Sequence, residues 1–145
     1  MVKLLVAAVL FFTTGLVPYP WLNNLNNAEQ LAKRDHKLIL LNFSGSDWCI
    51  PCMKLRADIF NSDAFIKYAK DNLILVNADF PRKKKNELSR DQQKENDALA
   101  AKYNPEGRFP FTILLDSNGN KLKVWDGYYS EGPDNFVDEI TAVKE

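Results

Sequence analysis

The sequence predicts a single α/β domain on the basis of three observations. Two nearly continuous apolar runs, residues 38–43 and 73–79, have the length and composition of strands that are buried on both faces. The stretch between them has a helical pattern, which makes a βαβ unit and therefore a parallel pair of strands. Further along the chain, an Asn-Gly pair at 118–119 joins two more strands as a hairpin.

Length and composition fit one globular domain. The chain has 145 residues, of which 46% are hydrophobic and 12% are aromatic, which fits a packed core and excludes a disordered chain. Its 19 lysines and arginines balance 19 acidic residues, so no overall field attracts nucleic acid or an anionic membrane. The basic run at 82–85 is interpreted as a solvated loop, because Glu87, Asp91 and Glu95 follow it closely. We expect a monomer with no nucleic-acid partner.

The first residues have the pattern of a secretory signal peptide. Lys3 provides one positive charge, and residues 4–17 are almost wholly apolar. A helix of this length rises about 21 Å, which is short of the roughly 30 Å hydrocarbon core of a bilayer. We therefore predict a signal peptide over 1–15, cleaved after Gly15, and a mature domain over 16–145 that is periplasmic or secreted without a stable membrane anchor. The alternative is an uncleaved anchor or a buried N-terminal helix.

Hydrophobic periodicity and cap signals predict the remaining elements. Residues 81–105 are interpreted as a charged insertion, whose helix faces solvent except at Leu88, Leu99 and Tyr103. The last strand alternates charged and apolar residues, which is typical of a sheet edge. The expected elements are helices over 21–33, 49–61, 63–70, 86–103 and 131–143, and strands over 38–43, 73–79, 111–116 and 121–128.

The two cysteines of the chain, Cys49 and Cys52, lie within four residues of each other. Small secreted domains that disulfides stabilise usually have four or more cysteines, spread along the sequence. A bridge between these two closes a very small loop, so it contributes little stability through chain entropy. The spacing therefore indicates a reactive pair rather than a structural one.

The pair falls where a buried strand ends and a helix is expected to begin. The unpaired N–H groups and the positive dipole end of a helix start stabilise a thiolate, which is the nucleophile of disulfide exchange. Cys49 is therefore the expected attacking sulfur, and Cys52, one turn later, is the expected resolving thiol. Pro51 lies in the first turn, where a missing N–H costs nothing.

The residues around the pair carry a family resemblance. Residues 43–52 read Phe-Ser-Gly-Ser-Asp-Trp-Cys-Ile-Pro-Cys, and a Phe109-Pro110 step leads into a later strand. The sequence resembles the thioredoxin-like superfamily, and within it the small exported bacterial proteins with a Phe-x-Gly-Ser-x-Trp-Cys-x-x-Cys opening. The resemblance covers about residues 36–143.

The resemblance implies a fold and a substrate site. It implies a thioredoxin-like fold, with a central mixed β-sheet and helices on both faces, and a cis peptide bond at Pro110, opposite the sulfurs. The backbone of Phe109 would pair with an extended substrate segment, and Trp48 would form an apolar wall. Ile50 and Pro51, between the cysteines, complete the expected substrate-binding residues.

Four features depart from the family pattern. Thioredoxins have a buried aspartate beneath the active site that assists proton transfer from the second thiol, and Asn42 occupies that position here. Phe111 stands where the family usually has a threonine after the cis-proline, and Ile50-Pro51 replaces Gly-Pro. Residues 81–105 are longer than the corresponding loop of a minimal thioredoxin.

The predicted function is thiol–disulfide exchange with disulfides or thiols of exported proteins, supported by an unidentified redox partner and needing no cofactor beyond the cysteine pair. Two alternatives stay open: a substrate-binding or chaperone module with little turnover, and a copper(I)-handling thiol protein. We expect no metal site, because zinc needs four ligands and His36 is the only histidine. The direction of electron flow is left open between reductase, oxidase and isomerase.

Overall fold

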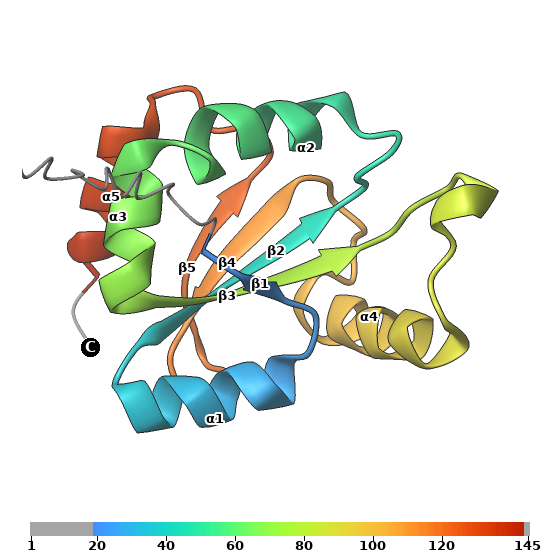
Figure 1. Cartoon of the computed structure of the whole chain (residues 1–145), viewed down its shortest axis with the longest axis horizontal. Coiled ribbons are helices and arrows are strands. Elements are labelled where there is room, and N and C mark those ends of the chain that lie inside the picture. The colour runs from blue at the N-terminus through green and yellow to red at the C-terminus, as the bar shows by residue number, and fades with distance from the viewer. Residues whose placement is uncertain (1–18, 144–145) are drawn as a thin grey trace, which may run out of the picture.

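A five-stranded sheet forms the centre of the molecule (Figure 1). The computed structural model describes residues 19–143, so the predicted signal peptide lies outside the described residues. Strand β2 pairs in parallel with β3 and in antiparallel orientation with β4. Strand β5 pairs in antiparallel orientation with β4 and is the outermost strand on that side. The predicted mixed sheet is therefore confirmed. In sheet order, the strands are β1 (Trp21–Leu22), β3 (Leu73–Asp79), β2 (Leu38–Ser44), β4 (Phe111–Leu115) and β5 (Lys121–Asp126).

Helices cover both faces of the sheet, as the resemblance implies (Figure 1). Alternate residues of β2 point to opposite faces: Ile39 and Leu41 pack toward α1 and α4, whereas Leu40 packs toward α2, α3 and α5. No helix within residues 19–143 has the length and apolar character needed to cross a membrane. The helical segments are α1 (Leu25–Asp35), α2 (Ile50–Leu55), the π-helical η1 (Arg56–Phe60), α3 (Asp63–Asn72), the 3₁₀ turn η2 (Lys84–Asn86), α4 (Arg90–Tyr103) and α5 (Pro133–Thr141).

The beginning of the first predicted helix is wrong. Trp21 and Leu22 form β1, which pairs in parallel with Leu75 and Val76 of β3. The helix begins only at Leu25, because the Asn24 side chain accepts a hydrogen bond from the backbone N–H of Asn27 at 2.8 Å and so caps it. Apolar residues at helical spacing preceded that cap, and periodicity alone does not show which of them lie in the helix.

The charged insertion is attached to the core at the middle and at the C-terminal end of its helix. Helix α4 begins at Arg90, later than predicted, since the Ser89 hydroxyl caps it by accepting from the Gln92 N–H. Tyr103 is buried as predicted, and its hydroxyl donates to the carbonyl of Gly119 at 2.8 Å. In the middle of the helix, Asn96 is only 2% exposed, and its Nδ2 donates to the carbonyl of Asp79, the last residue of β3, at 2.8 Å.

We expect Asn96→Ala to lower the free energy of unfolding by about 1–3 kcal/mol, because it leaves the half-buried Asp79 carbonyl without its side-chain donor. Chemical denaturation measures the change. Lys94→Ala on the same helix is the matched control, since Lys94 is exposed and a surface substitution of this kind usually shifts stability by less than about 0.5 kcal/mol. Equal effects of the two variants would contradict the role of Asn96 as an anchor.

Candidate active site

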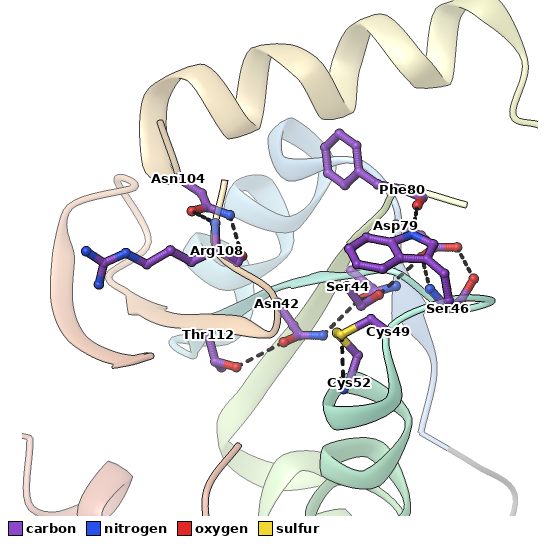
Figure 2. The surroundings of a disulfide bond; sticks show 12 residues. Asn42, Ser44, Ser46, Cys49, Cys52, Asp79, Phe80, Asn104, Arg108 and Thr112 are labelled. Carbon is purple, nitrogen blue, oxygen red and sulfur yellow. Dashed lines mark hydrogen bonds between the residues drawn. A yellow bond between two sulfur atoms is a disulfide. The ribbon is translucent and has the colours of Figure 1, made fainter. Parts of the chain in front are cut away.

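Cys49 and Cys52 form a disulfide at the beginning of α2 (Figure 2). Cys49 is the N-cap of the helix, and its sulfur accepts a hydrogen bond from the backbone N–H of Cys52 at 3.2 Å. Pro51 lies in the first turn, as the sequence predicts. Cys49 is 4% exposed and Cys52 is 6% exposed, whereas Ile50 between them is 75% exposed. The two sulfurs therefore lie just below the surface, next to a projecting apolar side chain.

A glycine shapes the turn that carries β2 into the site. Cys49 donates its backbone N–H to the carbonyl of Gly45 at 2.9 Å, which closes the turn between β2 and α2. The indole of Trp48 lies directly over Gly45, and a Cβ at this position would stand 2.2 Å from a ring carbon. Glycine is therefore required for the ring to lie where it does, immediately before the reactive pair.

Trp48 belongs to an aromatic cluster beside the disulfide. Its ring nitrogen donates to the carbonyl of Phe80 at 2.7 Å, and its ring centroid lies 5.4 Å from that of Phe109 in an edge-on arrangement. Phe80 and Phe109 also meet edge-on at 5.5 Å. Phe80 was not predicted as a site residue. Its position directly after the predicted parallel strand 73–79 was the signal that could have placed it at this edge.

The Phe109-Pro110 peptide bond is cis, which confirms what the resemblance implies. Phe111 pairs with Phe43, so Pro110 lies at the same sheet edge from which β2 continues toward Cys49. Pro110 is buried, and its carbonyl accepts from the Gly127 N–H at 2.9 Å. By contrast, Phe109 is half-buried, and its own backbone N–H and carbonyl make no hydrogen bond to any residue of 19–143.

A chain of neutral polar side chains runs beneath the disulfide (Figure 2). Thr112 donates its hydroxyl to Oδ1 of Asn42 at 2.9 Å, and Nδ2 of Asn42 donates to Oδ1 of Asn77 at 3.0 Å. The Ser44 hydroxyl continues the chain toward Asn77 at 3.1 Å and toward the Asp79 carboxylate at 3.3 Å. Asn42 thus uses its amide both as donor and as acceptor, which a carboxylate in its place is unable to do.

A small cavity separates this chain from the second cysteine. Its volume is about 40 Å³, which is enough for a water molecule. Cys52 therefore faces a polar space rather than a tightly packed apolar one. The cavity is lined by Asn42, Ser44, Ser46, Cys52, Met53 and Arg56.

Asp47 ties the basic loop to the site. Its carboxylate accepts hydrogen bonds at 2.9 Å from the backbone N–H groups of Arg82 and Lys83 and from Nδ2 of Asn86. The Arg82 amide, followed by the Asn86 side chain, lowers the pKa of Asp47 to about 2. The Arg82 guanidinium also lies 3.7 Å from the ring centroid of Trp48. Residues 82–85 are exposed, as predicted, but their attachment to the site was missed.

Comparison with known proteins identifies the family. A model of the thioredoxin-like domain family matches residues 25–144. The chain belongs to this family. The match begins earlier than the predicted resemblance over 36–143, because it includes the whole of α1.

Relatives of this thioredoxin-like protein match it over different shares of their own length. The chain is 40% identical over 115 residues to the disulfide bond reductase DsbH of Chlamydia pneumoniae. The matched region covers 79% of this chain and 67% of the relative. The chain is 28% identical over 125 residues to the thioredoxin-related protein DsbJ of the same organism, covering 86% of this chain and 35% of the relative. The solved structure of a DsbH oxidoreductase superposes with a TM-score of 0.76 at 29% identity and covers 94% of each chain.

Family and similarity together make this thioredoxin-like protein a thiol–disulfide oxidoreductase with a Cys-x-x-Cys pair at Cys49 and Cys52. Trp48, Ile50, Pro51, Phe109 and Pro110 lie around that pair, or at the sheet edge beside it, as the sequence analysis expected. Their roles in binding substrate stay predictions.

Replacing Asn42 with aspartate tests the neutral chain beneath the disulfide. We expect the new carboxylate to face Oδ1 of Asn77 without a donor, so its pKa in the folded protein rises above the ordinary value of about 3.9. A raised folded pKa means that stability is retained at low pH and lost as the pH rises through that pKa. The melting temperature of Asn42→Asp, relative to wild type, should therefore fall from about pH 4 upward. A pH-independent difference would contradict this account.

The low pKa of Asp47 gives a second test. Because its folded pKa of about 2 is below the unfolded value of about 3.9, the stabilisation is present above the unfolded pKa and is lost as the pH falls through about 2. The amide NMR signals of Arg82 and Lys83 should therefore not titrate between about pH 6 and about pH 3. Asp47→Ala should shift both signals toward random-coil positions. A titration midpoint near the ordinary aspartate value would show that the carboxylate does not hold the loop.

Proposed function

We propose that this protein reduces disulfide bonds of exported proteins, with Cys49 as the attacking thiolate and Cys52 as the resolving thiol. The observation that carries the proposal is the Cys49–Cys52 pair at the start of α2, at the sheet edge where the Phe109 backbone is unpaired. The family match and the 40% identity to a disulfide bond reductase support it.

The reaction conserves electrons and protons in two exchanges. The Cys49 thiolate of the reduced protein attacks one sulfur of a substrate disulfide, forms a mixed disulfide and releases the other substrate sulfur as a thiolate, which takes up a proton. Cys52 then loses its proton to solvent, and its thiolate attacks the sulfur of Cys49. The second substrate sulfur leaves as a thiolate, which takes up a proton, and the protein carries the Cys49–Cys52 disulfide seen in the structure.

The position of Cys49 explains why it is the nucleophile. As N-cap of α2, it has the positive end of the helix beside its sulfur, and the Cys52 N–H already points at that sulfur from 3.2 Å. Both features favour the thiolate over the thiol. Cys52 lies inside the first turn and lines the small polar cavity, where a water molecule would accept its proton.

The residues between the cysteines favour a reductant. A strong oxidant of this family owes its potential to a heavily stabilised thiolate in the reduced form. Here the side chains of Ile50 and Pro51 are apolar, so neither donates a hydrogen bond to the Cys49 sulfur. Pro51 also has no backbone N–H that could donate one. The thiolate is thus held mainly by the helix start. We expect a reduction potential nearer to about −270 mV than to about −120 mV, the values of thioredoxin and of a strong oxidant.

The surroundings of the pair suit an extended substrate segment. The unpaired backbone N–H and carbonyl of Phe109 offer one donor and one acceptor to a strand-like peptide. Trp48 forms an apolar wall on one side, and the exposed Ile50 projects beside the sulfurs. Recognition through the main chain gives affinity with little dependence on the substrate sequence.

The compartment and the electron donor follow from the same proposal. The apolar pattern at 4–17 supports export by a signal peptide over 1–15, into the periplasm or the medium. A reductant outside the cytoplasm needs a thiol donor that returns the Cys49–Cys52 disulfide to the reduced state, so we infer a dedicated redox partner.

Replacing the two cysteines one at a time tests the order of attack. We expect Cys49→Ser to abolish disulfide exchange, and Cys52→Ser to accumulate mixed disulfides, because the substrate stays bound to Cys49 without a resolving thiol. Reduction of a model disulfide and non-reducing gels with mass spectrometry measure the two outcomes. Mixed disulfides through Cys52 in the Cys49→Ser variant, with none through Cys49, would reverse the assignment. Absence of exchange in the wild type would reject the function.

A further inference from the structure

Four consecutive cationic residues lie in a loop that contacts the two residues before Cys49. Arg82, Lys83, Lys84 and Lys85 are all exposed, and none of them forms an ion pair within residues 19–143. They lie in and just before the 3₁₀ turn η2, beyond the same end of the sheet from which β2 leads into α2 (Figure 1). The established exchange chemistry makes no use of them.

This loop is held in place rather than simply solvated. The Asp47 carboxylate, two residues before Cys49, accepts from the Arg82 and Lys83 amides and from the Asn86 side chain. Trp48 adds a second attachment, because its ring stacks under Arg82 and its nitrogen bonds to the Phe80 carbonyl. The position of the four charges relative to the disulfide is therefore fixed by the two residues that precede Cys49.

Two acidic groups near the loop, Asp47 and Asp79, already receive hydrogen bonds, whereas Glu87 and Asp91 are exposed. Asp47 receives three hydrogen bonds from the loop itself, and Asp79 receives hydrogen bonds from Ser44 and from both the amide and the hydroxyl of Ser46. Glu87, which follows η2, is the exposed acidic residue next to the run. On the helix side of the pair, the exposed Arg56 lines the cavity that Cys52 also lines, so a further cationic side chain lies close to the second cysteine.

We propose that residues 82–85 form a docking surface for substrates whose reactive disulfide is flanked by acidic residues. The proposal rests on the proposed reductase function and specifies its substrate class. The acidic residues of such a segment would be attracted to the cationic loop that Asp47 and Trp48 hold next to Cys49. The backbone of Phe109 then supplies affinity without sequence preference, and the basic loop supplies the preference.

Because its charges are exposed, this surface should make the rate of substrate association depend on ionic strength. Steering by a cluster of like charges raises association rates by about 10-fold or more at low salt and is lost as ionic strength rises. The screening length falls to about 8 Å at physiological salt, so the loop acts on charges within a few residues of the reacting cysteines. We expect the loop to change kcat/KM, because the lysines do not touch the sulfurs.

The experiment compares three cyclic peptides that contain one disulfide and differ only in flanking residues, which are three glutamates, three serines or three lysines. Reduced wild-type protein should reduce the glutamate peptide with a kcat/KM about 10-fold above the serine peptide at low salt. The lysine peptide should be the poorest substrate. The preference should shrink as salt is added.

A triple variant locates the preference. Lys83→Gln, Lys84→Gln and Lys85→Gln together remove three charges and keep the backbone bond from Lys83 to Asp47. We expect this variant to lose the preference for the glutamate peptide and to reduce the serine peptide as fast as wild type. The matched control replaces Lys33, Lys67 and Lys70 with glutamine, since these exposed lysines lie on α1 and α3, away from η2. It should keep the wild-type preference.

Two results would overturn the docking surface while leaving the reductase function intact. One is equal reduction of all three peptides by wild type. The other is an equal loss of preference in the loop variant and in the control triple variant, which would assign the effect to net charge. Failure of wild type to reduce any of the peptides would instead count against the proposed function itself.

Discussion

The structure depends on one buried strand. Every residue of β2 after Leu38 is buried, and the strand is bonded on one side to the parallel β3 and on the other to the antiparallel β4. Parallel strands end at the same edge, and an antiparallel strand begins there. The segment after β2, the segment after β3 and the Phe109-Pro110 step before β4 therefore meet at one edge. The disulfide, the aromatic cluster and the basic loop all belong to these three segments.

Burial of β2 also decides which polar groups are acceptable beneath the disulfide. A charge on the buried side chain of residue 42 would be desolvated, whereas an amide there both donates and accepts. The hydrogen bonds lead from Thr112 outward until they reach Asp79, where the sheet ends and the carboxylate is half-exposed. Neutral groups thus occupy the interior, and the nearest carboxylate stands at the rim. The first thiolate, at Cys49, receives its stabilisation from the helix instead.

Local patterns were sufficient for much of the fold and for the reactive pair. The strands over 38–43 and 73–79 were predicted because burial on both faces leaves a continuous apolar run, which any short window of sequence shows. The Cys-x-x-Cys pair at a strand-to-helix junction is equally local. By contrast, Trp21 and Leu22 pair with residues of β3 far along the chain. Nothing in their neighbourhood separates a short edge strand from the first turn of a helix.

The missed parts of the site share this non-local origin. Asp47 bonds to Arg82 and Lys83, and Asn96 bonds to Asp79, across sequence separations that no periodicity spans. A basic run followed by acidic residues has the same composition whether it is solvated or anchored. What distinguishes the two is a carboxylate on another segment, and only the meeting of β2 and β3 at one edge brings it there.

The exchange chemistry and the proposed substrate preference depend on different parts of the fold. The reacting sulfurs and the unpaired backbone of Phe109 are held by the buried strands, whose register leaves little freedom to vary. The insertion over 81–105 lies outside the sheet and is anchored at a few points, through Asp47, Asn96 and Tyr103. Its exposed side chains can change without disturbing the register of β2. Exchange chemistry is therefore a property of the sheet edge, and substrate preference is free to reside in the loop fixed beside it.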